Sequence, residues 1–271
     1  MSTTLILIIV NVIFSWIGFR NPTFYEQCIF EIDKILVLRD YKRLLTSGFL
    51  HADWRHLVMN MFSLLLFSNT LEGAVGSSGF LLIYFCSLLG GSLFMLFVHR
   101  YQSDYRALGA SGAVCGVIFA AIAYQPDMMV FLWILPVPGW IFGIGYVLYT
   151  IMGMFRRSDN IGHDAHLSGG VTGMLLMIAM RPYILPEHPV VIAAILLPVL
   201  VVAGLLIRNP HILLTDSSQK AFMNIDQRYN AARTSRRKEV DALLEKIHEK
   251  GINSLTQAER NLLDEYSQEI N

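Results

Sequence analysis

Seven long apolar stretches, almost free of charge, are the feature that most restricts what this chain can fold into. A helix needs about 20 apolar residues to cross the roughly 30 Å hydrocarbon core of a bilayer, and each stretch is close to that length. Of the 271 residues 54% are hydrophobic and 15% are charged, which leaves too little polar surface for a soluble domain. We therefore predict an all-α polytopic helix bundle embedded in a lipid bilayer. The stretches are residues 4–19, 57–71, 79–98, 107–124, 128–153, 165–180 and 189–207.

Two of these stretches need a closer interpretation. Residues 4–19 have the length of a signal-peptide core, but no basic residue precedes them and no A-x-A cleavage site follows, so we expect an uncleaved first helix. In 128–153, Pro136 and Pro138 restrict the backbone. We expect that helix to begin near the second proline.

Two parts of the chain are polar enough to lie outside the membrane. The connection 20–55 is too long for a structureless loop in a compact fold, so we expect it to fold onto the bundle. Beyond the helix at 189–207, the chain is expected to continue as a polar linker, 208–234. Apolar residues at helical spacing then predict a soluble helical hairpin over 235–271.

Charge and cysteine usage exclude several classes of protein. The chain has 21 basic and 21 acidic residues, so its net charge gives no electrostatic reason to bind nucleic acid. Cys28, Cys86 and Cys115 are widely spaced and match no metal-binding pattern. We therefore expect neither a disulfide framework nor a zinc site.

Polar side chains stand at the starts of three apolar stretches. His56 and Asn60 open the second, Ser111 opens the fourth and His166 opens the sixth. If successive spans alternate in direction, these starts share one membrane face and roughly one depth. Polar groups at helix ends are often merely interfacial. A hydroxyl, two imidazoles and a carboxamide are nevertheless the groups that acyl transfer requires.

Small residues favour a close approach of the helices that carry Ser111 and His166. A serine hydroxyl needs a base within hydrogen-bond distance to act as a nucleophile, and an imidazole can supply one. His56 and Asn60, spaced i and i+4, share a helix face and can donate together to a developing oxyanion, with the Ser111 backbone N–H as a third donor. The small residues are Gly112, Gly116 and Ala120 on one helix and Gly169, Gly170 and Gly173 on the other.

Other arrangements of these residues are weaker candidates. His163 and His166 flank Asp164, but the chain has no His-Glu-x-x-His motif and no evident third ligand, so we predict neither metal nor cofactor. Ala113 stands where the nucleophile elbow of a soluble α/β-hydrolase has glycine. His99 lies at a segment end and is expected to be solvated or interfacial.

Taken together, the three motifs resemble the signature of the rhomboid intramembrane serine proteases. The likeness covers about residues 1–183 and implies a six-helix core, with the helix at 189–207 added to it. It also implies a Ser–His dyad without a third acid, in a cavity that admits water below the membrane surface. The motifs are His56-Leu57-Val58-Met59-Asn60, Gly109-Ala110-Ser111-Gly112, and Ala165-His166-Leu167-Ser168-Gly169 with Gly173.

The resemblance also implies roles and partners. Ser111 would be the nucleophile, His166 the general base and acid, and His56 and Asn60 the oxyanion donors. The substrates would be transmembrane segments of other proteins, and the tail is similar to one found in bacterial rhomboids, which suggests a bacterial inner membrane. Four residues after the serine the family often has an aromatic that stacks on the histidine. Here that position is Cys115, expected to be a small core residue, so this position supplies no aromatic ring to hold His166.

Two other functions remain as alternatives. Non-catalytic rhomboid-like proteins bind or escort client transmembrane helices, but they usually lack the serine or the histidine, and both are present here. A proton-coupled transporter with intramembrane histidines is disfavoured, because no inverted repeat is apparent.

The membrane orientation of the site receives two opposing indications. Basic residues are concentrated in the connections on the motif face, and Arg181 stands nearly alone on the other, which by the positive-inside rule puts the site in the cytoplasm. The resemblance implies a cavity open to the exterior. We follow the resemblance, because most of those basic residues lie in 20–55, which is also rich in acidic residues.

Overall fold

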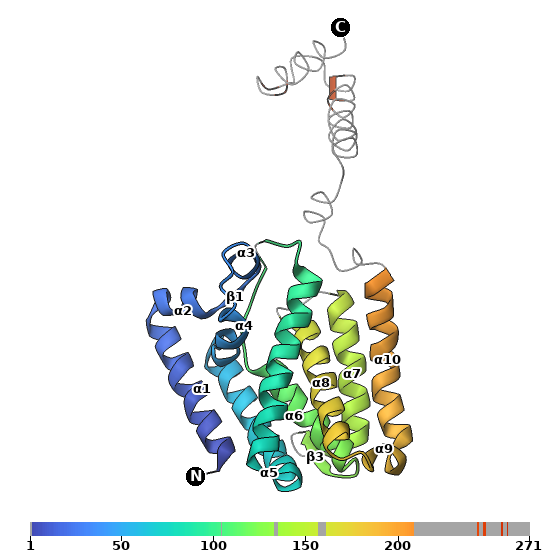
Figure 1. Ribbon diagram of the computed structural model, residues 1–271. Coiled ribbons are helices and arrows are strands. Elements are labelled where there is room, and N and C mark those ends of the chain that lie inside the picture. The colour runs from blue at the N-terminus through green and yellow to red at the C-terminus, as the bar shows by residue number, and fades with distance from the viewer. Residues whose placement is uncertain are drawn as a thin grey trace. The chain divides into compact units, whose positions relative to one another are not determined.

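The membrane part of the chain is a bundle of helices in the computed structural model (Figure 1). The structure describes residues 2–103, 105–132, 135–156 and 161–208, and, further on, 243, 246, 247, 256 and 259. The helices are α1 (Thr3–Arg20), α2 (Pro22–Cys28), α3 (Ile32–Leu36), α4 (Arg43–Thr46), the 3-10 helix η1 (Ser47–Phe49), α5 (Trp54–His99), α6 (Ser111–Tyr124), α7 (Gly139–Arg156), α8 (His163–Met180), α9 (Ile184–Glu187) and α10 (Pro189–Arg208). The strands are β1 (Phe30–Glu31), β2 (Arg106–Ala107), β3 (Met129–Leu132) and β4 (Leu135–Pro138).

The long element α5 contains the two helices expected at 57–71 and 79–98. Gly76 between them has φ 71° and ψ 171°, a non-helical conformation that glycine adopts without steric cost. The chain reverses direction at this glycine, because one pocket is lined by residues from both sides of it. They are His56, Met59, Asn60 and Ser63 before it and Leu88, Gly91, Ser92 and Met95 after it. Among the described residues, α1, α5 and Pro189–Leu206 are both long and apolar enough to cross a membrane, while α6 is a shorter apolar helix.

The stretch 128–153 is helical only in its second part. Residues before Gly139 form the antiparallel pair β3–β4, in which Val130 faces Val137. Pro136 and Pro138 lack the N–H that a helix interior needs, so α7 begins directly after the second proline, as predicted.

The connection 20–55 folds onto the bundle, as expected. Arg43, only 4% exposed, donates from Nη1 to the carbonyl oxygens of Glu26 at 2.8 Å and Ile29 at 2.7 Å. Strand β1 pairs with β2, so this connection is tied to the segment that leads to Ser111. Arg106 bonds Glu26 across the same junction at 2.5 Å and holds the pKa of that carboxyl below its usual value.

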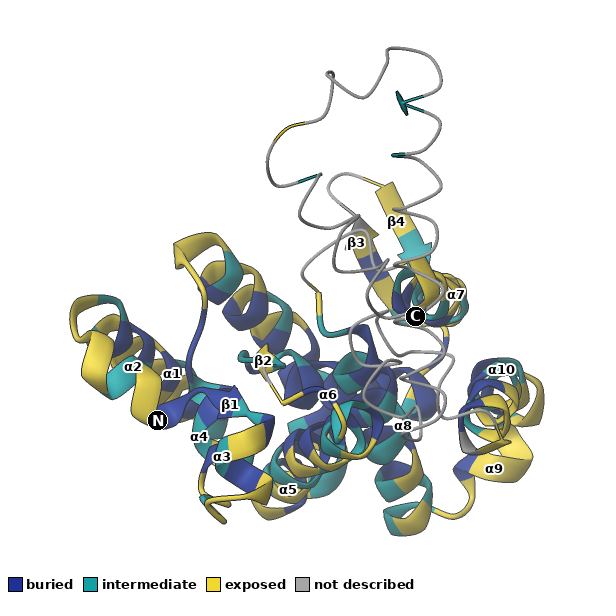
Figure 2. Cartoon of the chain, turned by 90° about the horizontal axis from the view of Figure 1, so that it is seen from above, coloured by how far each residue is buried: buried dark blue, intermediate teal, exposed yellow. Residues whose placement is uncertain are grey.

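Helix α6 forms the centre of the bundle, and Figure 2 shows it as mainly buried. Glycines let α8 lie directly against it. A Cβ on Gly173 would stand 2.5 Å from the Cα of Gly116, and one on Gly169 would stand 2.8 Å from the carbonyl carbon of Gly112. Real Cβ atoms essentially never approach other atoms within 3.0 Å, so only glycine permits this contact.

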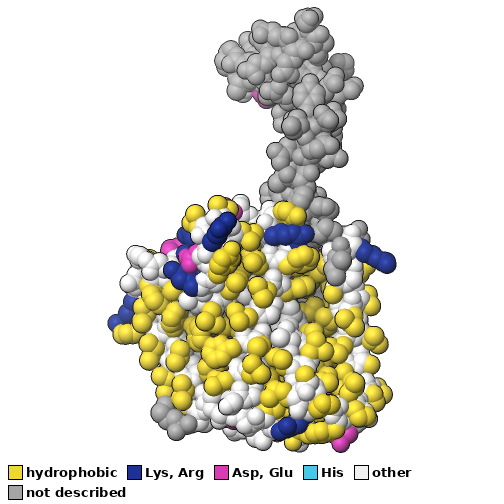
Figure 3. Space-filling model, in the orientation of Figure 1, with side chains coloured by type: hydrophobic (Ala, Val, Ile, Leu, Met, Phe, Trp, Pro, Cys, Tyr) yellow, Lys and Arg dark blue, Asp and Glu magenta, His cyan; other side chains and the backbone are white. Residues whose placement is uncertain are grey.

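The outer helices present apolar side chains outward, as a lipid-facing surface requires. Leu5 and Ile13 of α1 and Leu197 and Leu200 of α10 are all at least 44% exposed. Figure 3 shows hydrophobic side chains along the helices and Lys and Arg side chains near the two ends of the bundle. With the helical fold, this supports the predicted membrane bundle.

His99 is not a solvated side chain, which was one of the two environments expected for it. Its side chain is only 13% exposed, stacks on Tyr105 at 3.6 Å and pairs through Nε2 with the Asp164 carboxylate at 2.9 Å. A buried carboxylate such as Asp164 needs a partner, and α5 supplies it from a position 65 residues earlier in the chain. The pair joins the end of α5 to the start of α8.

Residues 215–271 form a second compact unit. Most of the helical hairpin predicted at 235–271 lies outside the described residues. Within the unit, Lys246 forms an ion pair with Glu259 at 2.7 Å.

Candidate active site

Ser111 is the first residue of α6, and the residue two positions earlier shapes the backbone in front of it. Gly109 has φ 127°, a conformation that side-chain-bearing residues rarely adopt. A Cβ there would lie 3.0 Å from His56 Nε2 and 3.6 Å from Ser111 Oγ. Glycine at this position therefore leaves open the space between the imidazole and the hydroxyl.

His56 and Asn60 are one turn apart at the start of α5. Asp53 caps this helix by accepting from the His56 backbone N–H at 2.8 Å. The Ala52 N–H donates to His56 Nδ1 at 3.5 Å, so a neutral ring carries its proton on Nε2, the nitrogen nearest the Gly109 gap. Asn60 donates one amide hydrogen to the His56 carbonyl at 3.0 Å and keeps a second.

His51, fully buried, holds the backbone next to Ser111. The Ala110 N–H donates to His51 Nε2 at 3.5 Å, and the His51 Nδ1–H donates to Ser15 Oγ at 2.9 Å. Ser15 in turn donates to the Phe49 carbonyl at 2.9 Å. Burial, with a smaller contribution from His56, lowers the pKa of His51 from 6.5 to about 3. The ring is therefore neutral at physiological pH, as this chain of donors and acceptors requires.

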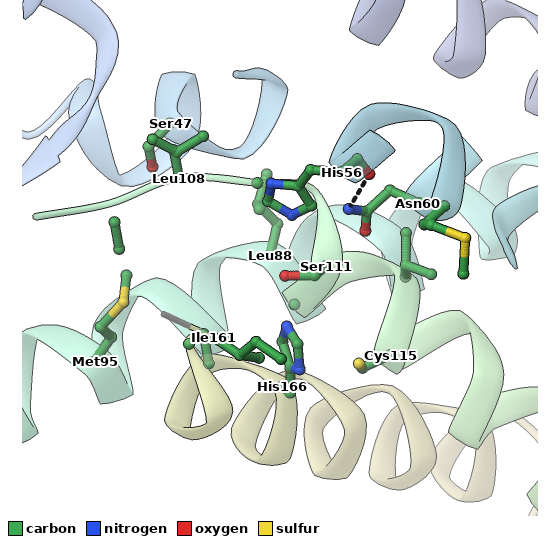
Figure 4. Close-up of a pocket in the computed structure, with 18 of the residues that line it drawn as sticks. Ser47, His56, Asn60, Leu88, Met95, Leu108, Ser111, Cys115, Ile161 and His166 are labelled. Carbon is green, nitrogen blue, oxygen red and sulfur yellow. Dashed lines mark hydrogen bonds between the residues drawn. The ribbon is translucent and has the colours of Figure 1, made fainter. Parts of the chain in front are cut away.

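All four residues singled out from the sequence line one cavity of about 970 Å³. Figure 4 shows the Ser111 hydroxyl between the rings of His56 and His166, with Asn60 beside His56. They come from the starts of α5, α6 and α8. The cavity is large enough for water and for a segment of peptide chain.

Sequence reasoning missed Tyr146, a residue of α7 that contacts His166 of α8. Tyr146 Oη lies 3.0 Å from His166 Nδ1, and Cys115 Sγ lies 3.2 Å from the same oxygen. Cys115 itself is 2% exposed and packs as a small core residue, as expected. Tyr146 is one of many aromatics in its apolar stretch, and no motif or spacing separates it from lipid-facing neighbours.

Asp164, which lies between the two histidines considered above as a metal pair, contacts His99 instead. Among the described residues no group of three metal-ligating side chains comes together. The fold and site thus define a membrane-embedded helix bundle with a serine and two histidines around one cavity.

Comparison with known proteins identifies the family. Residues 38–183, more than half of the chain, match the rhomboid domain. The chain therefore belongs to the rhomboid family. Residues 223–269 match another family, DUF6576, whose function is unknown. The matched segment covers most of the predicted hairpin.

Several curated proteins are similar to the rhomboid part. Rhomboid protein 1, mitochondrial, of Saccharomyces cerevisiae is 30% identical over 179 residues, 61% of this chain and 52% of that protein. RHOMBOID-like protein 12, mitochondrial, of Arabidopsis thaliana is 30% identical over 154 residues, 51% and 46% of the two chains. The putative rhomboid protease YdcA of Bacillus subtilis is 37% identical over 78 residues, 29% and 38%.

The aligned region spans about half the length of the first two relatives. Both relatives are named as mitochondrial proteins, so this comparison does not support the location expected from the sequence, a bacterial inner membrane. The chain is an integral membrane protein of the rhomboid family.

Proposed function

We propose that this protein is an intramembrane serine endopeptidase that hydrolyses peptide bonds in or near transmembrane segments of other proteins. The observation that carries the proposal is the position of the Ser111 hydroxyl between His56 and His166 in one cavity. Membership of the rhomboid family supports it, as does the name of the putative protease from Bacillus subtilis.

The proposed reaction begins with attack by Ser111 Oγ on the scissile carbonyl carbon, while His166 Nε2 takes the hydroxyl proton. The carbonyl oxygen becomes an oxyanion that accepts from His56 Nε2–H, the free amide hydrogen of Asn60 and the Ser111 N–H. His166 then gives its proton to the leaving amine as the C–N bond breaks. Water attacks the acyl-serine ester, again with His166 as base, and releases the new carboxyl end.

The length of α6 supports a site below the membrane surface. Its 14 residues extend about 21 Å at 1.5 Å per residue, less than the roughly 30 Å of the hydrocarbon core. A helix of this length that reaches one surface begins, at Ser111, inside the membrane. A transmembrane segment approaching from the lipid meets the serine at that depth.

Cleavage of a transmembrane reporter by the purified protein tests the proposal. Wild-type protein is expected to cleave it, and Ser111→Ala and His166→Ala are each expected to abolish cleavage, because members of one catalytic unit are not additive. Ser77→Ala, an exposed serine beyond the cavity, is the matched control. Persistent cleavage by purified Ser111→Ala would refute the serine mechanism. A wild-type protein that binds the reporter without cleaving it would indicate the client-binding alternative.

A further inference from the structure

Tyr146 approaches His166 on the nitrogen that the proposed reaction does not use for the proton exchange with Ser111. Its phenolic oxygen is 3.0 Å from Nδ1, and the two rings are 6.3 Å apart with an interplanar angle of 24°. The contact comes from α7, which supplies none of the four residues named in the mechanism. It is therefore a separate feature of the site.

The neighbours of Tyr146 hold its ring in place. Phe142, one turn earlier on α7, lies 5.8 Å from it at 26°, and Phe119 of α6 lies 5.9 Å from it at 59°. Cys115 Sγ, 3.2 Å from the phenolic oxygen, gives the hydroxyl a second partner. A ring packed in this way keeps its oxygen fixed relative to α6 and α8.

Cys115 also explains how the tyrosine reaches the histidine. This residue is one turn after Ser111 on α6, the position where the family often has an aromatic. The small thiol side chain there lets Tyr146 reach His166 from α7. The tyrosine supplies an aromatic ring and a hydroxyl from a different helix.

We propose that Tyr146 is a positioning residue for the dyad, which fixes the tautomer and the direction of the His166 ring. The inference rests on the proposed function. A base that takes a proton on Nε2 must carry its own proton on Nδ1, and the Tyr146 oxygen accepts that hydrogen while its own O–H donates to Cys115 Sγ. When the ring becomes an imidazolium during attack, the same oxygen remains as an acceptor and stabilises the charge.

Several other titratable side chains surround the His166 ring. Among the described residues, titratable side chains near it include Cys115 of α6, Tyr146 and Tyr149 of α7, and His163 of α8, whose ring is 6.2 Å away. His56 and Asp53 line the same cavity. Loss of the phenolic oxygen removes the acceptor that lies 3.0 Å from Nδ1 of the protonated ring.

Tyr146→Phe keeps the ring and removes only the oxygen. We expect kcat for the transmembrane reporter to fall about 10- to 100-fold, the usual effect of losing a hydrogen bond to a charged group, with KM within about twofold. The acidic limb of the kcat/KM profile should move to lower pH, because the protonated ring has lost its acceptor. Tyr124→Phe, which removes a hydroxyl at the far end of α6, should match wild type.

The pH profile separates positioning from a merely structural role. Loss of folded enzyme at acidic pH would move the limb to higher pH, opposite to the expected shift, so the direction stays informative if Tyr146→Phe folds less well. A wild-type rate in Tyr146→Phe, or a lower rate with an unmoved acidic limb, overturns the inference while Ser111→Ala remains inactive and the protease stands. Wild-type protein that cleaves nothing overturns the inference and the proposed function together.

Discussion

Replacing Gly173 with alanine tests the helix contact on which the site depends. The new Cβ would stand 2.5 Å from the Cα of Gly116. Carbon atoms pack at about 3.5 Å or more, so α6 and α8 would have to separate by about 1 Å. Because the opposing atoms are backbone, no rotation of a side chain relieves the clash.

The separation has two measurable effects. Overpacking a tight contact costs about 1–3 kcal/mol, so Gly173→Ala should unfold at a lower denaturant concentration than wild type, followed by circular dichroism in detergent. Movement of α8 also carries His166 away from Ser111. A displacement of about 1 Å at a reacting centre costs about 100-fold in rate, which reporter cleavage under folding conditions would detect.

Gly73→Ala provides the matched control, since nothing lies within 4 Å of a Cβ at this helical position in α5. Alanine there should leave cleavage unchanged and stability equal or slightly higher. If Gly173→Ala had the stability and cleavage rate of wild type, α6 and α8 would not be in glycine-dependent contact, and the geometry described for the site would be wrong.

Three further predictions concern the oxyanion donors, the buried histidine and the orientation. His56→Ala and Asn60→Ala should each lower kcat by about 10²–10³ with little change in KM, and wild-type turnover in both would make the pair structural. The pKa of His51 is about 3 in the folded protein against 6.5 in the unfolded chain, so the unfolded chain binds a proton first as pH drops. The free energy of unfolding should therefore fall below pH 6.5, by about 2 kcal/mol at pH 5. Denaturant titrations should show this loss in wild type and a shallower one in His51→Gln, and equal slopes would contradict it. In a cysteine-free background, an impermeant thiol reagent should label Ser103→Cys in intact cells and Ser77→Cys only after permeabilisation; the reverse pattern would place the cavity in the cytoplasm.

Much of the bundle follows from local sequence patterns. Apolar length located the helices, and prolines set the start of α7. The spacing of Gly112, Gly116, Gly169 and Gly173 predicted the α6–α8 contact, because small residues at helical spacing leave the backbone exposed along one stripe. Polar residues at three helix starts indicated the cavity, because spans that alternate in direction bring those starts to one membrane face.

Contacts between distant side chains did not follow from such patterns. His99 and Asp164 are 65 residues apart, and each resembles an ordinary helix-end polar residue until the fold pairs them. Tyr146 has the same limitation: its contact with His166 depends on how α7 packs against α8 and on the small side chain of Cys115. Sequence spacing within one helix carries no information about either pairing.

The central claim is that Ser111 is a nucleophile activated by His166, and reaction with a fluorophosphonate probe tests it most directly. Attack by Ser111 Oγ on phosphorus would expel fluoride and leave a stable adduct, which mass spectrometry can assign to one residue. We expect the adduct on Ser111 in wild-type protein and in Ser77→Ala, and none in Ser111→Ala or His166→Ala. An adduct that persists in folded Ser111→Ala, or wild-type protein that does not react, would contradict the claim.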